Sequence, residues 1–228
     1  MAFLPGDFHF MLCSFALSFL ALVLGYWALS HEQFRLMNFA GLANSTSGAF
    51  SYFLEYNYWT PPRLGGLRIG MEDFLISYGV GLLAWLVVAL LWRGKLQICL
   101  DWFLAFKRFL ALAAVCYATY LIMVWVSINP MTALIVICMA LAAFLIYLKP
   151  GNWPLALTGS LAFSVTWFAV CVIIFQLLPD FLLTWNLSGS WGWFLFGVPA
   201  GEIIWAAAFG AVLPLLTGYV FGVRICYK

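Results

Sequence analysis

Long apolar runs, separated by short polar segments, divide this chain almost from one end to the other. About 20 apolar residues are needed to cross the hydrocarbon core of a bilayer, so each run is a candidate membrane-spanning helix. The clear candidates are residues 8–29, 71–92, 109–128, 131–148, 154–178 and 198–221. The pattern therefore predicts an all-α fold, a polytopic membrane helix bundle.

Residues 34–56 are more polar than the other candidates, and the sequence leaves their placement open. The segment contains Asn38, Asn44 and several serine and threonine residues. It could cross the membrane inside the bundle, where hydroxyls and amides bond across helices. It could equally be re-entrant or lie at the interface. Counting it as a span gives about seven transmembrane helices, the number we prefer.

The segments between the runs carry turn and interface signals. Prolines and glycines make residues 58–68 a loop, and Asn129–Pro130 and Lys149–Pro150 are predicted tight turns. Residues 93–108 combine aromatic residues with flanking cations, which is typical of an amphipathic interface segment. Three tryptophans in the loop 179–195 are also suited to the membrane–water interface; they are Trp185, Trp191 and Trp193.

Composition supports an integral membrane protein and argues against other classes. The chain is 66% hydrophobic and only 8% charged, whereas soluble domains carry about 25% charged residues. A net charge of +2 and the lack of a basic run give no reason to expect a nucleic-acid partner. The six cysteines form no CxxC pair, so we expect no metal site. The first apolar run follows no basic segment and is expected to be a retained helix rather than a signal peptide.

The basic residues predict an orientation in the cell inner membrane, because lysine and arginine are enriched in cytoplasmic loops. With seven spans, eight of the ten basic residues lie on one side, and only Arg63 and Arg68 lie on the other. With six spans the split weakens to seven against three. We therefore expect the N-terminus outside and the C-terminus in the cytoplasm.

Three carboxylates stand at the starts of apolar runs. Glu72 and Asp73 begin the run 71–92, and Glu202 lies near the start of the run 198–221. A charge in the bilayer centre costs about 2.5–3.5 kcal/mol even on the gentlest scales, so such acids are often functional. They could perform acid–base chemistry on an apolar substrate. Alternatively, they could cap helix N-termini or pair with Arg63 or Arg68.

The two acidic segments indicate an internal repeat. Gly70–Asp73 aligns with Pro199–Glu202 at an offset of 129 residues, which also places Gly81 on Gly210. The hypothesis is a 3+1+3 parallel tandem repeat, with a first three-helix unit (1–92), a linking segment and helix (93–130) and a second unit (131–228). Parallel repeats would bring both motifs in from the same membrane face. Glu72, Asp73 and Glu202 could then share one cavity.

Aromatic residues near the motifs are candidate substrate-binding groups. They are Trp59, Tyr78, Trp205 and Phe209. Aromatic faces attract positive charge and could stabilise a developing carbocation. The alternative is ordinary packing against lipid and neighbouring helices.

These motifs resemble those of the membrane-embedded, flavin-independent lycopene β-cyclases, whose pattern is Pro-x-Glu-Glu/Asp. The similar stretches are Gly70-Met71-Glu72-Asp73-Phe74, Val198-Pro199-Ala200-Gly201-Glu202-Ile203 and His31-Glu32-Gln33-Phe34-Arg35-Leu36. The chain departs from the family at Gly70, where the family has proline, and at Gly201, where it has an acid. The resemblance implies cyclisation of the linear ends of lycopene without net redox change or a cofactor. Glu72 and Glu202 would be the acid–base pair, with Asp73 in support.

Three functions remain open at this point. The first is such a carotenoid or isoprenoid cyclase of the intramolecular lyase or isomerase class. The second is a catalytically diverged membrane subunit or a lipid- or pigment-binding scaffold. The third, a small transporter, is supported only by Pro214 within the last run. Expected partners are membrane lipids and an apolar isoprenoid substrate or pigment, and a membrane protein is a further candidate partner. A common cavity for the acids would favour catalysis.

Overall fold

The chain folds into a bundle of long helices joined by short connections. The computed structural model describes residues 7–55, 57–186 and 192–225. Its α-helices are α1 (Asp7–Ala28), α2 (His31–Ser45), α3 (Ser51–Leu54), α4 (Met71–Leu91), α5 (Trp102–Trp125), α6 (Pro130–Leu148), α7 (Trp153–Leu177) and α8 (Ala200–Phe221). Its 3₁₀ turns are η1 (Thr46–Phe50), η2 (Leu64–Gly66), η3 (Pro150–Asn152) and η4 (Pro179–Thr184). Two antiparallel strand pairs join β1 (Leu96–Ile98) to β4 (Val223–Ile225) and β2 (Phe194–Leu195) to β3 (Val198–Pro199).

Within the described residues, six helices are long and apolar enough to cross a membrane. They are α1, α4, α5, α6, α7 and α8. The predicted all-α polytopic bundle is thereby confirmed. The turns between the spans also form where the sequence predicts them. The Asn129 side chain caps α6 by accepting a hydrogen bond from Met131 N at 3.0 Å, and Pro130 occupies the first helical position.

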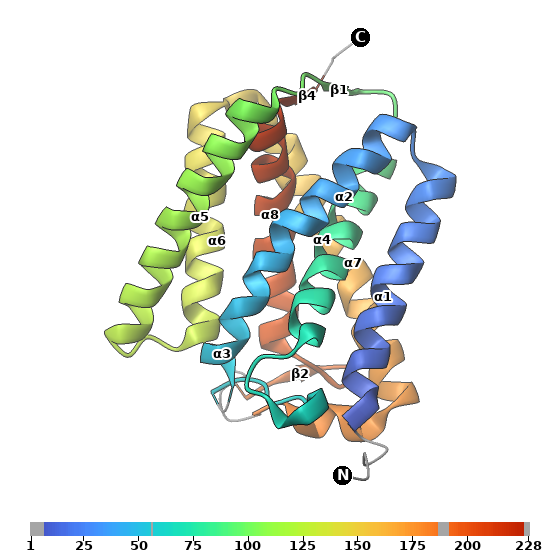
Figure 1. Ribbon diagram of the computed structural model, residues 1–228, viewed down its shortest axis with the longest axis vertical. Coiled ribbons are helices and arrows are strands. Elements are labelled where there is room, and N and C mark those ends of the chain that lie inside the picture. Colours follow the sequence, from blue (N-terminus) through green and yellow to red (C-terminus); the bar gives the residue numbers. More distant parts are fainter. Residues whose placement is uncertain (1–6, 56, 187–191, 226–228) are drawn as a thin grey trace.

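The polar segment is helical and lies inside the bundle. α2, η1 and α3 follow one another without a break and run beside α4 (Figure 1). Polar side chains of α2 bond to α4: Asn44 donates to Ser77 O at 2.7 Å, and Tyr78 donates to Asn38 Oδ1 at 2.8 Å. α2, at 15 residues, is shorter than each of the six apolar spans, and it packs along one of them, α4.

The helices run up and down the bundle, and α1 begins at the end opposite to that at which α8 finishes (Figure 1). The β1–β4 pair closes the end where α8 finishes, whereas η2 and the starts of α4 and α8 lie at the other end. Most basic residues belong to segments near the β1–β4 end of the bundle. These segments are the start of α2, the residues around β1, and the starts of α5 and η3. Which end faces the cytoplasm stays a prediction.

Two local predictions need correction. Residues 93–108 are not one interface segment, because β1 occupies their middle and α5 already begins at Trp102. The Asp101 side chain caps this helix by accepting a hydrogen bond from Leu104 N at 3.0 Å. Trp185 is buried rather than an interface anchor, whereas Trp193 is 51% exposed. Trp191 lies outside the described residues.

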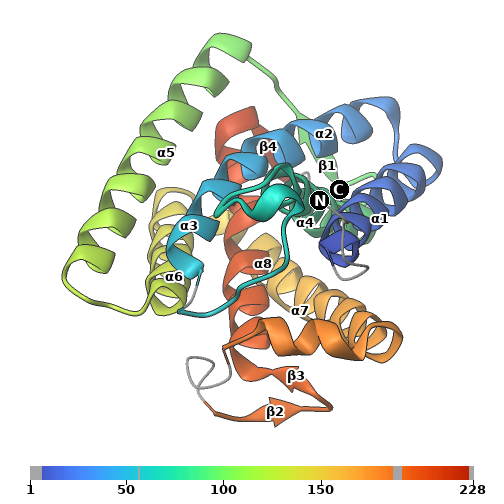
Figure 2. The ribbon, with the colours of Figure 1, turned by 60° about the horizontal axis from the view of Figure 1, so that its bottom comes forward.

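The centre of the bundle is formed by α4 and α8, the two helices that carry the acidic motifs. Both are more than half buried over their apolar stretch, at 56% and 61% respectively. In contrast, α5 buries only Ala105 and Tyr120, and it lies across α8 from α1 (Figures 1 and 2). The central position of α4 and α8 places both motifs in the interior. The tandem repeat itself stays a prediction.

Candidate functional site

Glu202 is a buried carboxylate that accepts hydrogen bonds from three neutral donors. It lies in the first turn of α8 and is 6% exposed. Its Oε1 atom accepts from the Tyr58 hydroxyl at 2.9 Å and from Trp185 Nε1 at 3.0 Å. Its Oε2 atom accepts from Trp167 Nε1 at 2.9 Å. Donors of this kind stabilise the ionised form of a carboxyl group.

The donors come from three separate parts of the chain. Tyr58 follows α3, Trp167 is in the middle of α7, and Trp185 follows η4. Burial and the Glu202 carboxylate raise the pKa of Tyr58 well above its ordinary value. The phenol therefore stays protonated over the physiological pH range and remains a donor to Glu202.

Gly201 leaves the room that Tyr58 needs. A Cβ atom at position 201 would lie 2.9 Å from the Tyr58 hydroxyl oxygen and 3.1 Å from its ring. The first acid of the resembling family's motif, which would stand at position 201, therefore has no room here in this arrangement. The glycine at position 201 therefore allows the hydrogen bond between Tyr58 and Glu202.

Glu202 also lines an elongated apolar cavity of about 270 Å³, which we call the central cavity. Its wall follows α8 from Glu202 to Leu216, a distance of about 21 Å at 1.5 Å per residue. The other walls are mostly apolar. They come from α6 and α7, including Leu134, Cys138 and Ile174, and from the segments α1 to α4, which add a few polar side chains such as Asn44 and Ser77. A single carboxylate thus stands in a long, largely apolar space.

Aromatic residues gather around the Glu202 end of the central cavity. Trp59, Trp205 and Phe209, three of the four predicted binding residues, line it together with Trp167 and Trp185. The ring centroids of Trp59 and Trp185 are 5.5 Å apart, and those of Trp205 and Phe209 are 5.2 Å apart. The fourth predicted residue, Tyr78, is not in the lining and bonds to Asn38 instead.

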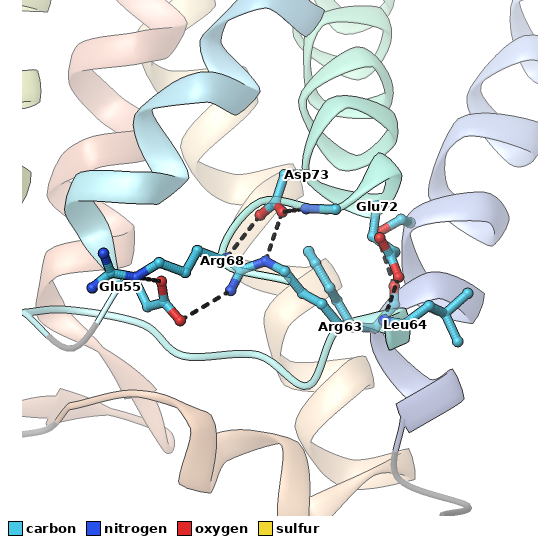
Figure 3. Close-up of polar contacts among 9 residues, drawn as sticks. Glu55, Arg63, Leu64, Arg68, Glu72 and Asp73 are labelled. Atoms are coloured by element: carbon cyan, nitrogen blue, oxygen red, sulfur yellow. Dashed lines mark hydrogen bonds and ion pairs between the residues drawn. The ribbon is translucent and has the colours of Figure 1, made fainter. Parts of the chain in front are cut away.

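Asp73, in the first turn of α4, belongs to a different polar cluster, which includes residues of the connection between α3 and α4 (Figure 3). Arg63 donates to it through two atoms, with Nε 2.6 Å from Oδ2 and Nη2 3.0 Å from Oδ1. Both side chains are buried, at 2% and 0% exposure. On its other side Arg63 approaches Glu55, whose second oxygen lies 3.3 Å from Arg68 Nε. We call these four residues the Arg63 cluster.

Asp73 accepts a hydrogen bond from a backbone N–H group at the start of α4, and Glu72 accepts one from a backbone N–H group at the start of η2. Gly70 N donates to Asp73 Oδ2 at 2.8 Å, and Leu64 N donates to Glu72 Oε1 at 2.8 Å (Figure 3). Proline at position 70 has no N–H and could not make the first bond. A Cβ atom there would also lie 2.0 Å from Glu72 Oε2. The glycine in place of the family's proline therefore fits the capping role of both acids.

The structure does not bring the three predicted catalytic acids into one cavity. The central cavity is lined by Glu202 but by neither Glu72 nor Asp73. Asp73 instead pairs with Arg63 and caps the start of α4. This is one of the two alternatives that the sequence left open. The sequence analysis missed Glu55 and the donors Tyr58 and Trp167. No signal marks those donors, which lie 144 and 35 residues from Glu202 in the chain.

No group of three or more His, Cys, Asp or Glu residues in the described part of the chain is placed to hold a metal ion. Cys13, Cys99, Cys116, Cys138 and Cys171 are free thiols. Cys226 lies outside the described residues.

Comparison of the chain with protein-family models, with curated proteins and with solved structures gives no match. The class of the protein therefore rests on its fold and its site. It is a polytopic helix-bundle membrane protein with a buried carboxylate in an apolar cavity.

Replacing Tyr58 by phenylalanine tests the donor set of Glu202. Loss of the hydroxyl leaves Oε1 with one donor fewer in a buried site, which should lower the free energy of unfolding by about 1–3 kcal/mol. The matched control is Tyr147→Phe, because Tyr147 is 81% exposed and its loss should be almost neutral. Thermal unfolding in detergent measures both. Equal unfolding temperatures for the two variants would show that the Tyr58 bond contributes nothing.

Proposed function

We propose that this integral membrane protein binds an elongated apolar molecule of the isoprenoid, carotenoid or lipid class in the central cavity. The observation that carries the proposal is the shape and chemistry of that cavity, a long apolar space with Glu202 near one end. Ligand sites are typically apolar clefts with a few polar groups that fix orientation. Glu202 and the aromatic residues around it would fix one end of the ligand.

A second cavity, of about 130 Å³, extends the space toward the other end of the bundle. It lies between α2, α5 and α8 and shares lining residues with the central cavity, among them Asn44, Cys116 and Leu216. Its wall continues along α8 to Phe221. From Glu202 to Phe221 the helix rises about 28 Å, close to the thickness of a bilayer's hydrocarbon core, about 30 Å. A long unbranched or polyene chain fits this extent better than a compact molecule.

The contacts of the three acids support ligand binding more strongly than catalysis. Acid-initiated cyclisation needs a carboxylic acid that delivers a proton to a double bond. The Glu202 oxygens accept hydrogen bonds from three donors, and Glu202 donates a proton in none of these bonds. Asp73 is paired with Arg63, and Glu72 is outside the cavity. This arrangement favours the lipid- or pigment-binding scaffold over the cyclase.

Cyclisation of a carotenoid end remains a second candidate because of one observation. Trp59, Trp205 and Phe209 line the cavity together with Glu202, and aromatic faces can stabilise a cationic intermediate. Expression in lycopene-accumulating cells separates the two functions. The binding proposal expects lycopene without cyclised product. Cyclised product from the parent, abolished by Glu202→Gln, would establish the cyclase instead.

A substitution that fills the central cavity tests binding directly. Cys138→Trp places a large side chain in the wall and should reduce the apolar ligand that co-purifies with the protein about tenfold or more, because the volume is no longer available. The matched control is Cys99→Trp, since Cys99 is exposed and lies outside the lining. Extraction of the purified proteins and mass spectrometry measure the bound molecules. Equal ligand content in both variants would reject the cavity as the binding site.

A further inference from the structure

Glu202 has hydrogen-bond donors but no countercharge. Among the described residues, the ion pairs join Arg63 to Glu55 and Asp73, and Arg68 to Glu55; none involves Glu202. Asp73 is equally buried but has the Arg63 guanidinium against both of its oxygens. A buried charge is costly unless it is paired, and neutral donors offset only part of that cost. When Glu202 is ionised, its charge at this end of the central cavity therefore has no ion-pair partner among the described residues.

The carboxylate also has capacity for one more donor. Its two oxygens offer about four acceptor positions, and Tyr58, Trp185 and Trp167 occupy two on Oε1 and one on Oε2. Glu202 itself is part of the cavity wall. A ligand in the cavity can thus approach Oε2 at the position that remains.

The surrounding rings favour a positive group at the same place. Trp59 and Trp205 line this end of the cavity without a hydrogen bond to Glu202, whereas Trp167 and Trp185 direct their N–H groups at it. The faces of aromatic rings attract ammonium groups, most strongly where water is excluded. An anionic head would be repelled by Glu202, and a neutral head would leave its charge uncompensated. A bare metal ion would find no second acidic ligand, since neither Glu72 nor Asp73 reaches the cavity.

We propose that the molecule bound in the central cavity is a single-chain amphiphile whose head is a protonated amine, with the ammonium group donating to Glu202 Oε2. This inference rests on the proposed binding function and narrows its ligand class. The ammonium supplies a countercharge that none of the described residues provides in an ion pair. The apolar tail then follows α8 toward Leu216.

Two probes with the same spin-labelled hexadecyl chain test the inference, one with a primary ammonium head and one with a hydroxyl head. The parent protein is held in neutral maltoside micelles, and quenching of its tryptophan fluorescence reports binding near the cavity. The ammonium probe should bind about tenfold more tightly than the alcohol. General attraction does not produce this preference, because the chain's own net charge is +2.

Two variants test whether Glu202 causes the preference for the ammonium probe. Glu202→Gln should remove the preference while the alcohol probe still binds, because the cavity and its shape remain. The matched control is Glu32→Gln, the same change at an exposed position, which should leave the preference intact.

Two negative results would distinguish a wrong ligand head group from a wrong binding site. Equal binding of both probes to the parent, lost in Cys138→Trp, would overturn the ammonium head and leave the proposed cavity function standing. Absence of saturable binding by either probe would reject the cavity function together with the inference. Because the parent alone gives the first comparison, a folding defect in Glu202→Gln would not hide the answer.

Discussion

Arg63→Ala is expected to lower the free energy of unfolding by about 3–5 kcal/mol, because it leaves a buried carboxylate without its partner. Asp73 would lose both guanidinium contacts, at 2.6 and 3.0 Å, while remaining fully buried. Glu55, also buried, would lose a cation 3.8 Å away. Since the Arg63 cluster holds the loop that precedes α4, the start of that helix should also become less protected from hydrogen exchange.

The matched control is Arg68→Ala, in the same cluster. The Arg68 side chain is 55% exposed, so water screens its contact with Glu55 and replaces it when it is lost. Exposed ion pairs of this kind contribute about 0–1 kcal/mol. Chemical unfolding of both variants in the same detergent gives the comparison. A loss for Arg63→Ala no larger than that for Arg68→Ala would mean that water reaches Asp73 and that the cluster is not a buried anchor.

Gly210→Ala is expected to destabilise the bundle by about 1–3 kcal/mol through overpacking between α7 and α8. A Cβ atom at position 210 would lie 2.5 Å from the backbone oxygen of Gly159, and one at position 159 would lie 2.2 Å from that of Gly210. Small residues allow membrane helices to approach in this way. Because the obstructing atoms are backbone, the helices themselves must separate. Alanine gains up to about 1 kcal/mol in helix propensity over glycine, which is too little to offset the clash.

Gly218→Ala is the matched control within α8. A Cβ atom there meets only Val223 O, at 3.5 Å, which is an ordinary contact. The helix-propensity gain is then unopposed, and the variant should be neutral or slightly more stable. Ligand binding gives a second readout, because α7 supplies Trp167 and α8 supplies Glu202. A Gly210→Ala protein as stable as Gly218→Ala would show that α7 and α8 separate at no cost.

Gly70 and Gly201, the two positions at which the chain departs from the lycopene β-cyclase motif, each have a local structural role. At position 70 the glycine N–H bonds to Asp73, and at position 201 the missing side chain makes room for Tyr58. Both departures from the family's motif therefore have local structural reasons in this chain. The family relationship stays a prediction, and so does carotenoid cyclisation.

The class of protein and the positions of most spans could be predicted from the amino-acid sequence alone. Hydropathy is a local property, and a bilayer demands about 20 apolar residues per crossing, so α1, α4 and α6 to α8 begin and end close to their predicted limits. The turn at Asn129–Pro130 was predictable for the same reason, since capping depends on adjacent residues. The sequence also singled out Glu202 and the aromatic residues Trp59, Trp205 and Phe209.

Only the tertiary structure decided what each acid contacts. Asp73 and Glu202 both stand in the first turn of an apolar helix, and no local pattern distinguishes them. Asp73 receives Arg63 from the preceding loop, whereas Glu202 receives Tyr58, Trp167 and Trp185 from distant parts of the chain. The position of the polar helix α2 likewise depends on a tertiary contact, the hydrogen bond from the Asn44 amide to α4. Whether a buried carboxylate acquires a countercharge or only neutral donors depends on long-range packing, which hydropathy and spacing do not encode.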